Sequence, residues 1–270
     1  MKKVIFTKEQ EEEIKKLYIQ DHISMTKIGE KFQVSKTVIR RILTKQTVEI
    51  RTDNHTYKAN YRAFQNIDSA EKAYWLGFIA ADGCVFERET NGSVKLNIHQ
   101  RDEEILIKLK NFLQSNVPIR HIIQNDGFSN NTPMSRIDFN SLEMVQDFKQ
   151  LGVPPKKSLI LKPPLIQEQY FLPYIAGYFD GDGSIFQLKN NEWGISIEGT
   201  KEILEWINSI LHISSILEQR NINSDKNNYY IRCGGTKKPY EIMKKIYEST
   251  PVHLERKYQK FLELHSRFIQ

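Results

Sequence analysis

The sequence predicts an α+β fold made of two similar half-domains, preceded by a small all-α domain. A ten-residue segment that begins at Tyr74 recurs in similar form at Tyr174. After each copy comes a stretch in which apolar and polar residues alternate, as in a strand. A stretch with the apolar spacing of an amphipathic helix follows it. Residues 1–45 show only helical spacing. We therefore expect a helical domain over residues 1–45, a basic linker over 46–66, and half-domains over 67–165 and 166–270.

The composition excludes several classes of protein. The chain has 270 residues, of which 39% are hydrophobic and 27% are charged, as in folded soluble proteins. Its two cysteines, Cys84 and Cys233, are too few for a disulfide scaffold or a zinc cluster. The sequence shows neither a signal peptide nor an apolar stretch of about 18 residues. We expect an intracellular protein of the cytoplasm or nucleoid, without a membrane-spanning segment.

Three helices are expected in the N-terminal domain. Thr7, Ser24 and Ser35 each precede a stretch with helical apolar spacing, as N-cap residues do. The third stretch, over residues 36–45, carries basic residues on its polar face. Residues 1–66 hold 14 Lys and Arg against 8 Asp and Glu, and residues 67–270 hold 25 of each, so the whole excess of +6 lies in the first quarter of the chain. Such a basic module suggests a polyanionic partner.

The pattern from Ile28-Gly29 to Ile39 resembles small helix-turn-helix domains. The resemblance implies that the third helix faces the major groove of DNA. The linker carries Arg51, Lys58 and Arg62, from which we expect it to follow phosphates. The expected DNA-binding residues are Ser35, Lys36, Thr37, Arg40, Arg41, Lys45 and Arg51. The alternative is an ordinary three-helix bundle with a charged surface.

The repeated segment is the most informative feature of the sequence. Tyr74-Trp-Leu-Gly-Phe-Ile-Ala-Ala-Asp-Gly83 corresponds to Tyr174-Ile-Ala-Gly-Tyr-Phe-Asp-Gly-Asp-Gly183, which places Asp82 and Asp182 100 residues apart. Each segment is expected to be helical with one face of small residues, so that two such helices can pack closely. Around a pseudo-twofold axis, both carboxylates would lie side by side and would repel unless a divalent cation lay between them. The alternative, for either copy alone, is a buried helix that ends in an Asp-Gly turn.

The elements after each motif are expected to match. The first half should contain strands over residues 94–98, 119–123 and 136–139 and a helix over 102–113. The second half should contain strands over 194–197, 215–217 and 229–233 and a helix over 201–211. Each half should end in a helix. The first motif helix should begin at a cap formed by Asp68 and Glu71, and the second near Pro173.

These motifs resemble those of LAGLIDADG homing endonucleases in their single-chain, two-motif form, over about residues 67–270. The resemblance implies two αββαββα half-domains joined at their motif helices, with saddle-shaped sheets along a long double-stranded DNA site. It also implies a monomeric endonuclease of a mobile element or phage that cuts both strands with Mg²⁺ or Mn²⁺. The metal-site residues it implies are Asp82, Asp182, Ala81 and Gly181. The first motif departs from the second at Ala80, where the second has Asp180.

Three further catalytic candidates follow from the repeat and the resemblance. Lys157 and Lys257 each lie 75 residues after their motif aspartate. The resemblance implies that such a basic residue stabilises charge near the scissile phosphate; the alternative is a pair of surface lysines. Gln100, at the end of the second strand, resembles a family residue that holds the attacking water, and its counterpart is expected at Gly199.

Other functions of the same fold remain open at this point. The architecture also occurs in cleavage-inactive DNA-binding regulators and in intron RNA maturases, which usually tolerate the loss of one acid. Both acids are present here, which favours cleavage. An intein is disfavoured, because residue 1 is not a nucleophile and the sequence does not end in His-Asn.

Overall fold

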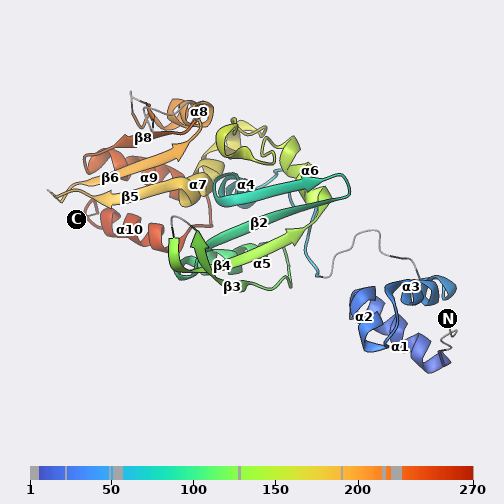
Figure 1. Cartoon of the computed structure of the whole chain (residues 1–270). Helices are drawn as coiled ribbons and strands as arrows, with labels where there is room; N and C mark the ends of the chain where they lie inside the picture. Colours follow the sequence, from blue (N-terminus) through green and yellow to red (C-terminus); the bar gives the residue numbers. More distant parts are fainter. Residues whose placement is uncertain are drawn as a thin grey trace. The chain divides into compact units, whose positions relative to one another are not determined.

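The computed structural model describes residues 6–21, 23–48, 50, 57–126, 129–189, 191–214, 217–219 and 227–269 (Figure 1). The chain divides into two compact units, Met1–Lys58 and Ala59–Gln270, of which the second is called the body below. The expected linker over residues 46–66 therefore ends too late. Ala63 and Phe64 are buried in the body, where the ring of Phe64 lies 4.7 Å from that of Phe148. Residues 59–66 belong to the body because these apolar side chains complete its core.

The N-terminal unit contains the three expected helices, α1 (Lys8–Ile19), α2 (Met25–Lys31) and α3 (Lys36–Lys45). Thr7 and Ser24 cap the first two with their side chains, whereas Ser35 occupies the N-cap position of α3 without a side-chain cap hydrogen bond. The turn between α2 and α3 is tight. A Cβ added at Gly29 would lie 2.5 Å from the carbonyl oxygen of Val34, so glycine is required there. The buried core consists of Ile14, Tyr18, Met25, Ile28, Ile39, Ile42 and Leu43.

The body contains two successive αββαββα units, as the sequence predicts. The first consists of α4 (Ala70–Asp82), β1 (Gly83–Arg88), β2 (Asn91–His99), α5 (Glu104–Phe112), β3 (Arg120–Asp126), β4 (Ser129–Asn140) and α6 (Leu142–Gln150), with the short turn η1 (Gln100–Asp102) before α5. The second consists of α7 (Phe171–Asp182), β5 (Gly183–Gln187), β6 (Trp193–Gly199), α8 (Lys201–Leu211), β7 (Glu218–Gln219), β8 (Tyr229–Cys233) and α9 (Lys237–Glu248), followed by α10 (Glu255–His265). Two further short turns, η2 (Lys157–Leu159) and η3 (Glu168–Tyr170), lie between the units. Part of the expected strand over residues 215–217 lies outside the described residues.

Each unit forms one antiparallel sheet, and the two sheets have the same strand order, β1-β2-β4-β3 and β5-β6-β8-β7. Alternation along each strand separates two faces. In β2, Val94, Leu96 and Ile98 are buried against helices, while Lys95 and Asn97 lie on the opposite, solvent-facing side. We call this solvent-facing side of the first sheet its outer face.

The motif helices α4 and α7 pack directly on each other at the centre of the body, between the two sheets (Figure 1). A Cβ added at Gly77 would lie 1.9 Å from the carbonyl oxygen of Tyr174, and one added at Gly177 would lie 1.9 Å from that of Tyr74. The two backbones therefore touch at equivalent points, as the small-residue faces predict. The cap of α4 differs from expectation, because Ser69, not Asp68, accepts the backbone hydrogen bond from Lys72.

Among the helices that the structure describes, none combines the length and the apolar character that crossing a membrane requires.

Candidate active site

Asp82 and Asp182 are the last residues of α4 and α7. The glycine that follows each of them turns the chain directly into a strand. A Cβ at Gly83 would lie 2.5 Å from the carbonyl oxygen of Ile79, and one at Gly183 would lie 2.4 Å from that of Phe179. The Asp-Gly pair thus allows each acid to end its helix at the helix interface and at the start of a sheet.

The two carboxylates influence each other. Asp82 is exposed and Asp182 is half-buried, but the surrounding protein displaces water from both and raises the pKa of both carboxyls. At Asp182 the negative charge of Asp82 adds to this desolvation, and the pKa rises to about 7. The positive charges of Lys157 and Lys257 oppose the shift at both acids. The four side chains therefore form one electrostatic cluster.

Lys157 and Lys257 are buried, with exposed fractions of 6% and 4%, so the surface-lysine alternative is wrong. The Nζ atom of Lys157 donates to the carbonyl oxygen of Ala81 at 2.6 Å. That of Lys257 donates to the carbonyl oxygens of Phe179, Asp180 and Gly183 at 2.5–2.8 Å, and to that of Gly181 at 3.4 Å. Each amine thus sits at the C-terminal end of one motif helix, where carbonyl groups favour a cation. Desolvation lowers the pKa of both amines, to about 8 for Lys257.

Two cavities flank the pair of motif helices. The cavity beside Asp182 is lined by Ala80 and Ala81 of the other motif helix, together with Lys157 and Glu198. The cavity beside Asp82 is lined by Asp180 and Gly181 of the other motif helix, together with Asn97 and Asp102. Each cavity therefore combines the acid of one motif with the helix end of the other, and neither half-domain forms a complete site by itself.

The Asp180 carboxylate links the first motif helix to the C-terminal part of the second half. It is buried and accepts hydrogen bonds from the Tyr74 hydroxyl at 2.6 Å, the Tyr247 hydroxyl at 2.9 Å and the backbone amide of Leu254 at 2.6 Å. It also supplies the largest favourable charge interaction of Lys257. Position 80 is alanine, and the hydroxyl of Tyr174, which is equivalent to Tyr74 in the repeat, is buried without a hydrogen-bond partner in the described part of the chain.

Asp102 and Arg256 connect the two halves at the rim of the Asp82 cavity. Arg256 Nε and Nη2 donate to the carboxylate of Asp102 at 2.9–3.2 Å, in a bidentate pair. Sequence reasoning missed these two residues, as well as Asn97 and Glu198. The one feature of the sequence that could have indicated Arg256 is its position directly before Lys257.

Gln100 is exposed and is the first residue of η1, whereas Asn97 and His99 of the preceding strand line the Asp82 cavity. Strand register also corrects its expected counterpart. Gly83 pairs with Leu96, but Gly183 pairs with Ile197, so the second hairpin is one residue longer. Asn97 therefore corresponds to Glu198, and Gln100 to Lys201 rather than to Gly199.

The expected DNA-binding residues of α3 share one exposed face. Lys36, Thr37, Arg40 and Arg41 are exposed, as is Ser35 at the N-cap. Lys45 is exposed at the end of the helix and pairs with Glu11 at 3.4 Å. Arg51 lies outside the described residues.

Comparisons with known proteins agree with this geometry. Residues 69–151 match the family model of the LAGLIDADG-like domain. The match ends before the second motif, but the second unit of the body repeats the helix interface and strand order of the first. The search of curated proteins returned no match.

Several solved structures are similar to this chain. A lysine-to-alanine mutant of the endonuclease I-SmaMI superposes with a TM-score of 0.50 at 13% identity, covering 72% of this chain and 89% of that one. I-GzeII in complex with its DNA target has a TM-score of 0.49 at 12% identity, covering 72% and 88%. I-LtrWI bound to target DNA has a TM-score of 0.48 at 12% identity, covering 78% and 92%.

Proposed function

We propose that this protein is a site-specific DNA endonuclease that hydrolyses phosphodiester bonds in both strands of a long duplex site. The observation that carries the proposal is the cluster of Asp82, Asp182, Lys157 and Lys257 at the ends of two helices in contact. The LAGLIDADG-like domain over residues 69–151 supports the same assignment. So do the target-DNA complexes of I-GzeII and I-LtrWI, as the expected kind of substrate. We also propose that the protein acts inside a cell and is encoded by a phage or another mobile element.

The donor set fits a hard divalent cation such as Mg²⁺ or Mn²⁺. Two mutually repelling carboxylates face two cavities, whose linings add oxygen atoms of Asn97, Asp102 and Glu198. Across the described residues, no three His, Cys, Asp or Glu side chains converge, so water and phosphate oxygens would complete the coordination. The carbonyl oxygens of Ala81 and Gly181 already accept hydrogen bonds from the two lysines, which makes Asp82 and Asp182 the main protein ligands. When bound, the ion would activate a water molecule and neutralise charge on the phosphate.

The residues around the acids have separate roles in this proposal. Lys157 and Lys257 place fixed positive charge beside the scissile phosphates, where negative charge develops. Asp180 positions Lys257 and joins α4 to α7 through Tyr74. Asn97 and Glu198 line the two cavities from the sheets and are better placed than Gln100 to orient water.

The N-terminal unit would extend the DNA contact. Lys36, Arg40 and Arg41 give α3 a basic exposed face, and helices of this kind fit the major groove. The charge excess of residues 1–66 supports this role.

The proposal is tested with the duplex made by joining the two DNA sequences that flank the gene. The full-length protein should cut both strands in Mg²⁺. Asp82→Asn and Asp182→Asn should each abolish double-strand cleavage and leave DNA affinity within about tenfold, because the metal site and not the groove contact is lost. Parent-like cleavage by the double variant would contradict the active-site assignment. Tight binding of this duplex, or of the flanking RNA, without any cleavage by the parent would instead identify a regulator or a maturase.

A further inference from the structure

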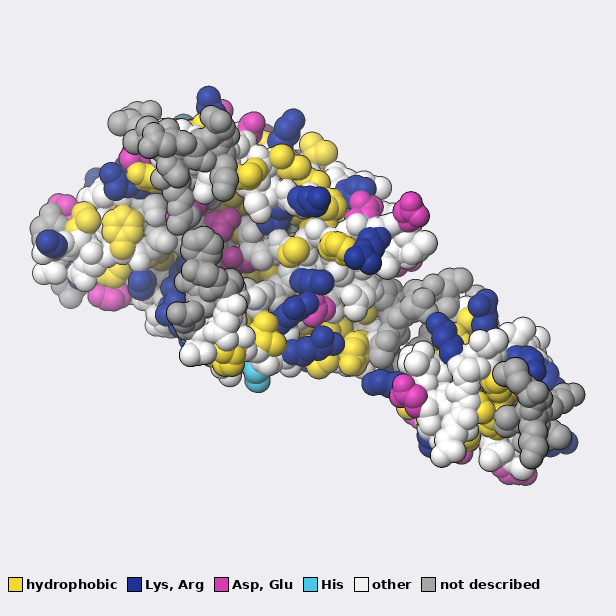
Figure 2. All heavy atoms as spheres, in the orientation of Figure 1, with side chains coloured by type: hydrophobic (Ala, Val, Ile, Leu, Met, Phe, Trp, Pro, Cys, Tyr) yellow, Lys and Arg dark blue, Asp and Glu magenta, His cyan; other side chains and the backbone are white. Residues whose placement is uncertain are grey.

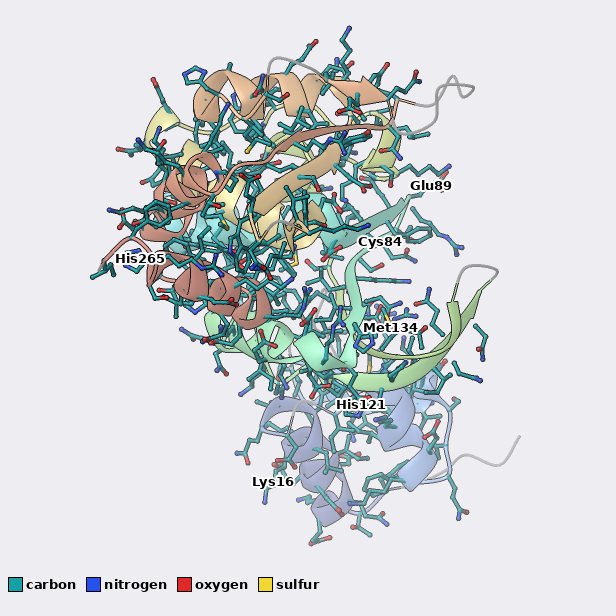
Figure 3. The ribbon with its side chains drawn as sticks, turned by 90° about the vertical axis from the view of Figure 1, so that its left-hand side faces the viewer. Lys16, Cys84, Glu89, His121, Met134 and His265 are labelled. Carbon is teal, nitrogen blue, oxygen red and sulfur yellow. The ribbon has the colours of Figure 1, made fainter. Side chains whose placement is uncertain are left out.

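The outer face of the first sheet continues directly from the candidate active site. Cys84 pairs with Lys95, Asn97 with Arg136, and His99 with Met134, so these side chains share one face. Asn97, His99 and Met134 also line the cavity beside Asp82. Figure 3 shows Cys84 and Met134 on this side of the sheet, with His121 on the other. A duplex whose phosphate reaches Asp82 must therefore lie over this face.

Arg136 is held rigidly on this face. Its Nε donates to both carboxylate oxygens of Asp138, at 2.9 and 3.2 Å, and its Nη2 donates at 2.9 Å. Asp138 lies two residues further along the same strand, and Arg120 of β3 approaches the same carboxylate at 3.8 Å. These hydrogen bonds raise the pKa of Arg136, so the guanidinium stays charged.

The bonds to Asp138 use one edge of the guanidinium, formed by Nε and Nη2. The second edge, formed by Nη1 and Nη2, points its donors in parallel. Guanine presents two acceptors, N7 and O6, with matching spacing in the major groove, and this pair is the commonest specific contact between arginine and DNA. A side chain that is already fixed loses less conformational entropy on binding than a free arginine.

We infer that Arg136, buttressed by Asp138, reads a guanine in the major groove of the DNA that this protein cleaves. The inference rests on the proposed function, since it assumes that a duplex occupies the outer face. The inference predicts that the target contains a guanine where the DNA lies over the first half-domain. Dark blue Lys and Arg side chains in Figure 2 spread over the region where Figure 1 draws the first sheet, consistent with an approaching polyanion.

The chain offers a matched control on the same sheet. Arg88, at the end of β1, shares the face of Cys84, and its guanidinium lies over the ring of Phe86 at 5.1 Å from the ring centre. Replacing Arg88 removes the same positive charge but leaves the Arg136 guanidinium and its hydrogen bonds to Asp138 in place. A residue that contacts only phosphate weakens binding to all sequences, whereas a residue that reads a base changes the preference at one position.

The test measures competitive binding in EDTA to the joined flanking duplex, with each base pair changed in turn to the other three. The parent should prefer guanine at one or more positions by about tenfold. Arg136→Gln should remove this preference at one position only, and Arg136→Lys should reduce it. Asp138→Asn should also reduce the preference, yet should strengthen binding to unrelated DNA, because a negative charge is removed. Arg88→Gln should weaken binding to all variants alike.

The inference is overturned if Arg136→Gln behaves like Arg88→Gln, with a uniform loss and an unchanged base profile. It is also overturned if Asp138→Asn keeps the full guanine preference, because the buttress would then have no role. Thermal melting of each variant shows whether the sheet remains folded, and the more conservative Arg136→Lys carries the test if Arg136→Gln unfolds. A parent that binds none of the duplexes contradicts the proposed function itself, and the cleavage assay reports that failure separately.

Discussion

At the scale of single residues, the buried lysines are the most informative part of the site. An ammonium group removed from water is stable only where acceptors replace the lost solvent. Lys257 has four backbone carbonyls around it and Lys157 has one carbonyl in hydrogen-bond contact. Both belong to the charge cluster of Asp82 and Asp182. The buried lysines therefore place positive charge beside the two acids, and Lys257 also stabilises the C-terminal end of α7.

Replacing either lysine by methionine keeps most of the apolar stem and removes the charge. Lys157→Met and Lys257→Met should each slow cleavage by at least about tenfold, while DNA affinity changes little, because the lost charge acts on the developing phosphate charge. Lys257→Met should also lower the melting temperature more than Lys157→Met, since more carbonyls lose their donor. Single-turnover cleavage and thermal melting measure the two effects.

Lys260 is the matched control for this comparison. It lies on α10, one turn after Lys257, and donates to the carbonyl oxygen of Ile185 at 2.8 Å. Lys260→Met should affect stability without a comparable effect on the cleavage rate. If Lys157→Met and Lys257→Met cleaved DNA as fast as Lys260→Met, neither Lys157 nor Lys257 would be a catalytic residue.

Asp182 gives the metal-free protein a specific pH dependence. Its carboxyl binds a proton more tightly in the folded state, where the pKa is about 7, than in the unfolded state, where the usual value is 3.8. Because the folded state then binds more protons, the free energy of unfolding falls as pH rises through this window. The raised pKa of Asp82 acts in the same direction.

Asp182→Asn should therefore raise the melting temperature in EDTA at about pH 7.5 by a few degrees, with little change near pH 4. Mg²⁺ should stabilise the parent at pH 7.5 and have a smaller effect on the variant, because one ligand is missing. Melting curves over this pH range, with and without Mg²⁺, test both statements. Identical pH profiles for the parent and the variant would show that Asp182 titrates normally.

At the scale of secondary-structure elements, the contact between α4 and α7 decides where the acids lie. Gly77 and Gly177 bring the helix backbones together, and the helix ends that carry Asp82 and Asp182 follow from that contact. Gly77→Ala would place its Cβ 1.9 Å from the backbone oxygen of Tyr174, which cannot rotate away as a side chain could. The helices must separate.

Gly77→Ala should destabilise the body by about 3 kcal/mol or more and should abolish cleavage. Gly234→Ala is the control, because the nearest atom to its added Cβ is a leucine methyl group at 3.6 Å. Urea unfolding measures the difference. A parent-like midpoint for Gly77→Ala would show that the interface is looser than the structure has it.

Much of this arrangement was predictable from the sequence, for identifiable reasons. The repeat places both aspartates and both lysines at equal spacing, and small residues reveal the helix interface. Burial of the lysines was not predictable, because it depends on the chain returning to the helix ends from the distant segments that hold η2 and α10. The hairpin of the second half is one residue longer, which shifts strand register and misplaces the counterpart of Gln100. The Arg256–Asp102 pair crosses between halves and leaves no local pattern.

At the scale of the whole molecule, the boundary between the two units lies at residue 58 and not at residue 66. The difference has a physical basis in Phe64, whose ring packs against Phe112 and Phe148, and in Arg62, which pairs with Asp147. A truncation that removes these residues damages the body itself.

A chain of residues 59–270 should therefore fold and cleave, but with weaker DNA binding than the full chain. Its footprint should shorten at one end only, because the N-terminal unit is present once. The logarithmic salt dependence should flatten by about 0.9 for each lost phosphate contact. A chain of residues 67–270 should melt at a lower temperature, since it lacks Phe64. An unchanged footprint and salt slope after removal of residues 1–58 would contradict DNA binding by α3.

The buried hydroxyl of Tyr174 means that the two halves are not interchangeable. If two copies of the first half associated through α4, each Tyr74 would meet an Ala80 instead of an Asp180, and both hydroxyls would lose their acceptor. Each buried hydroxyl left without a partner costs roughly 1–3 kcal/mol. In the protein as it is, only the Tyr174 hydroxyl lacks an acceptor in the described part of the chain, because Asp180 accepts from Tyr74. The network around Asp180 thus favours the pairing of unlike halves over the pairing of two first halves, and it discourages newly synthesised chains from associating through α4 alone.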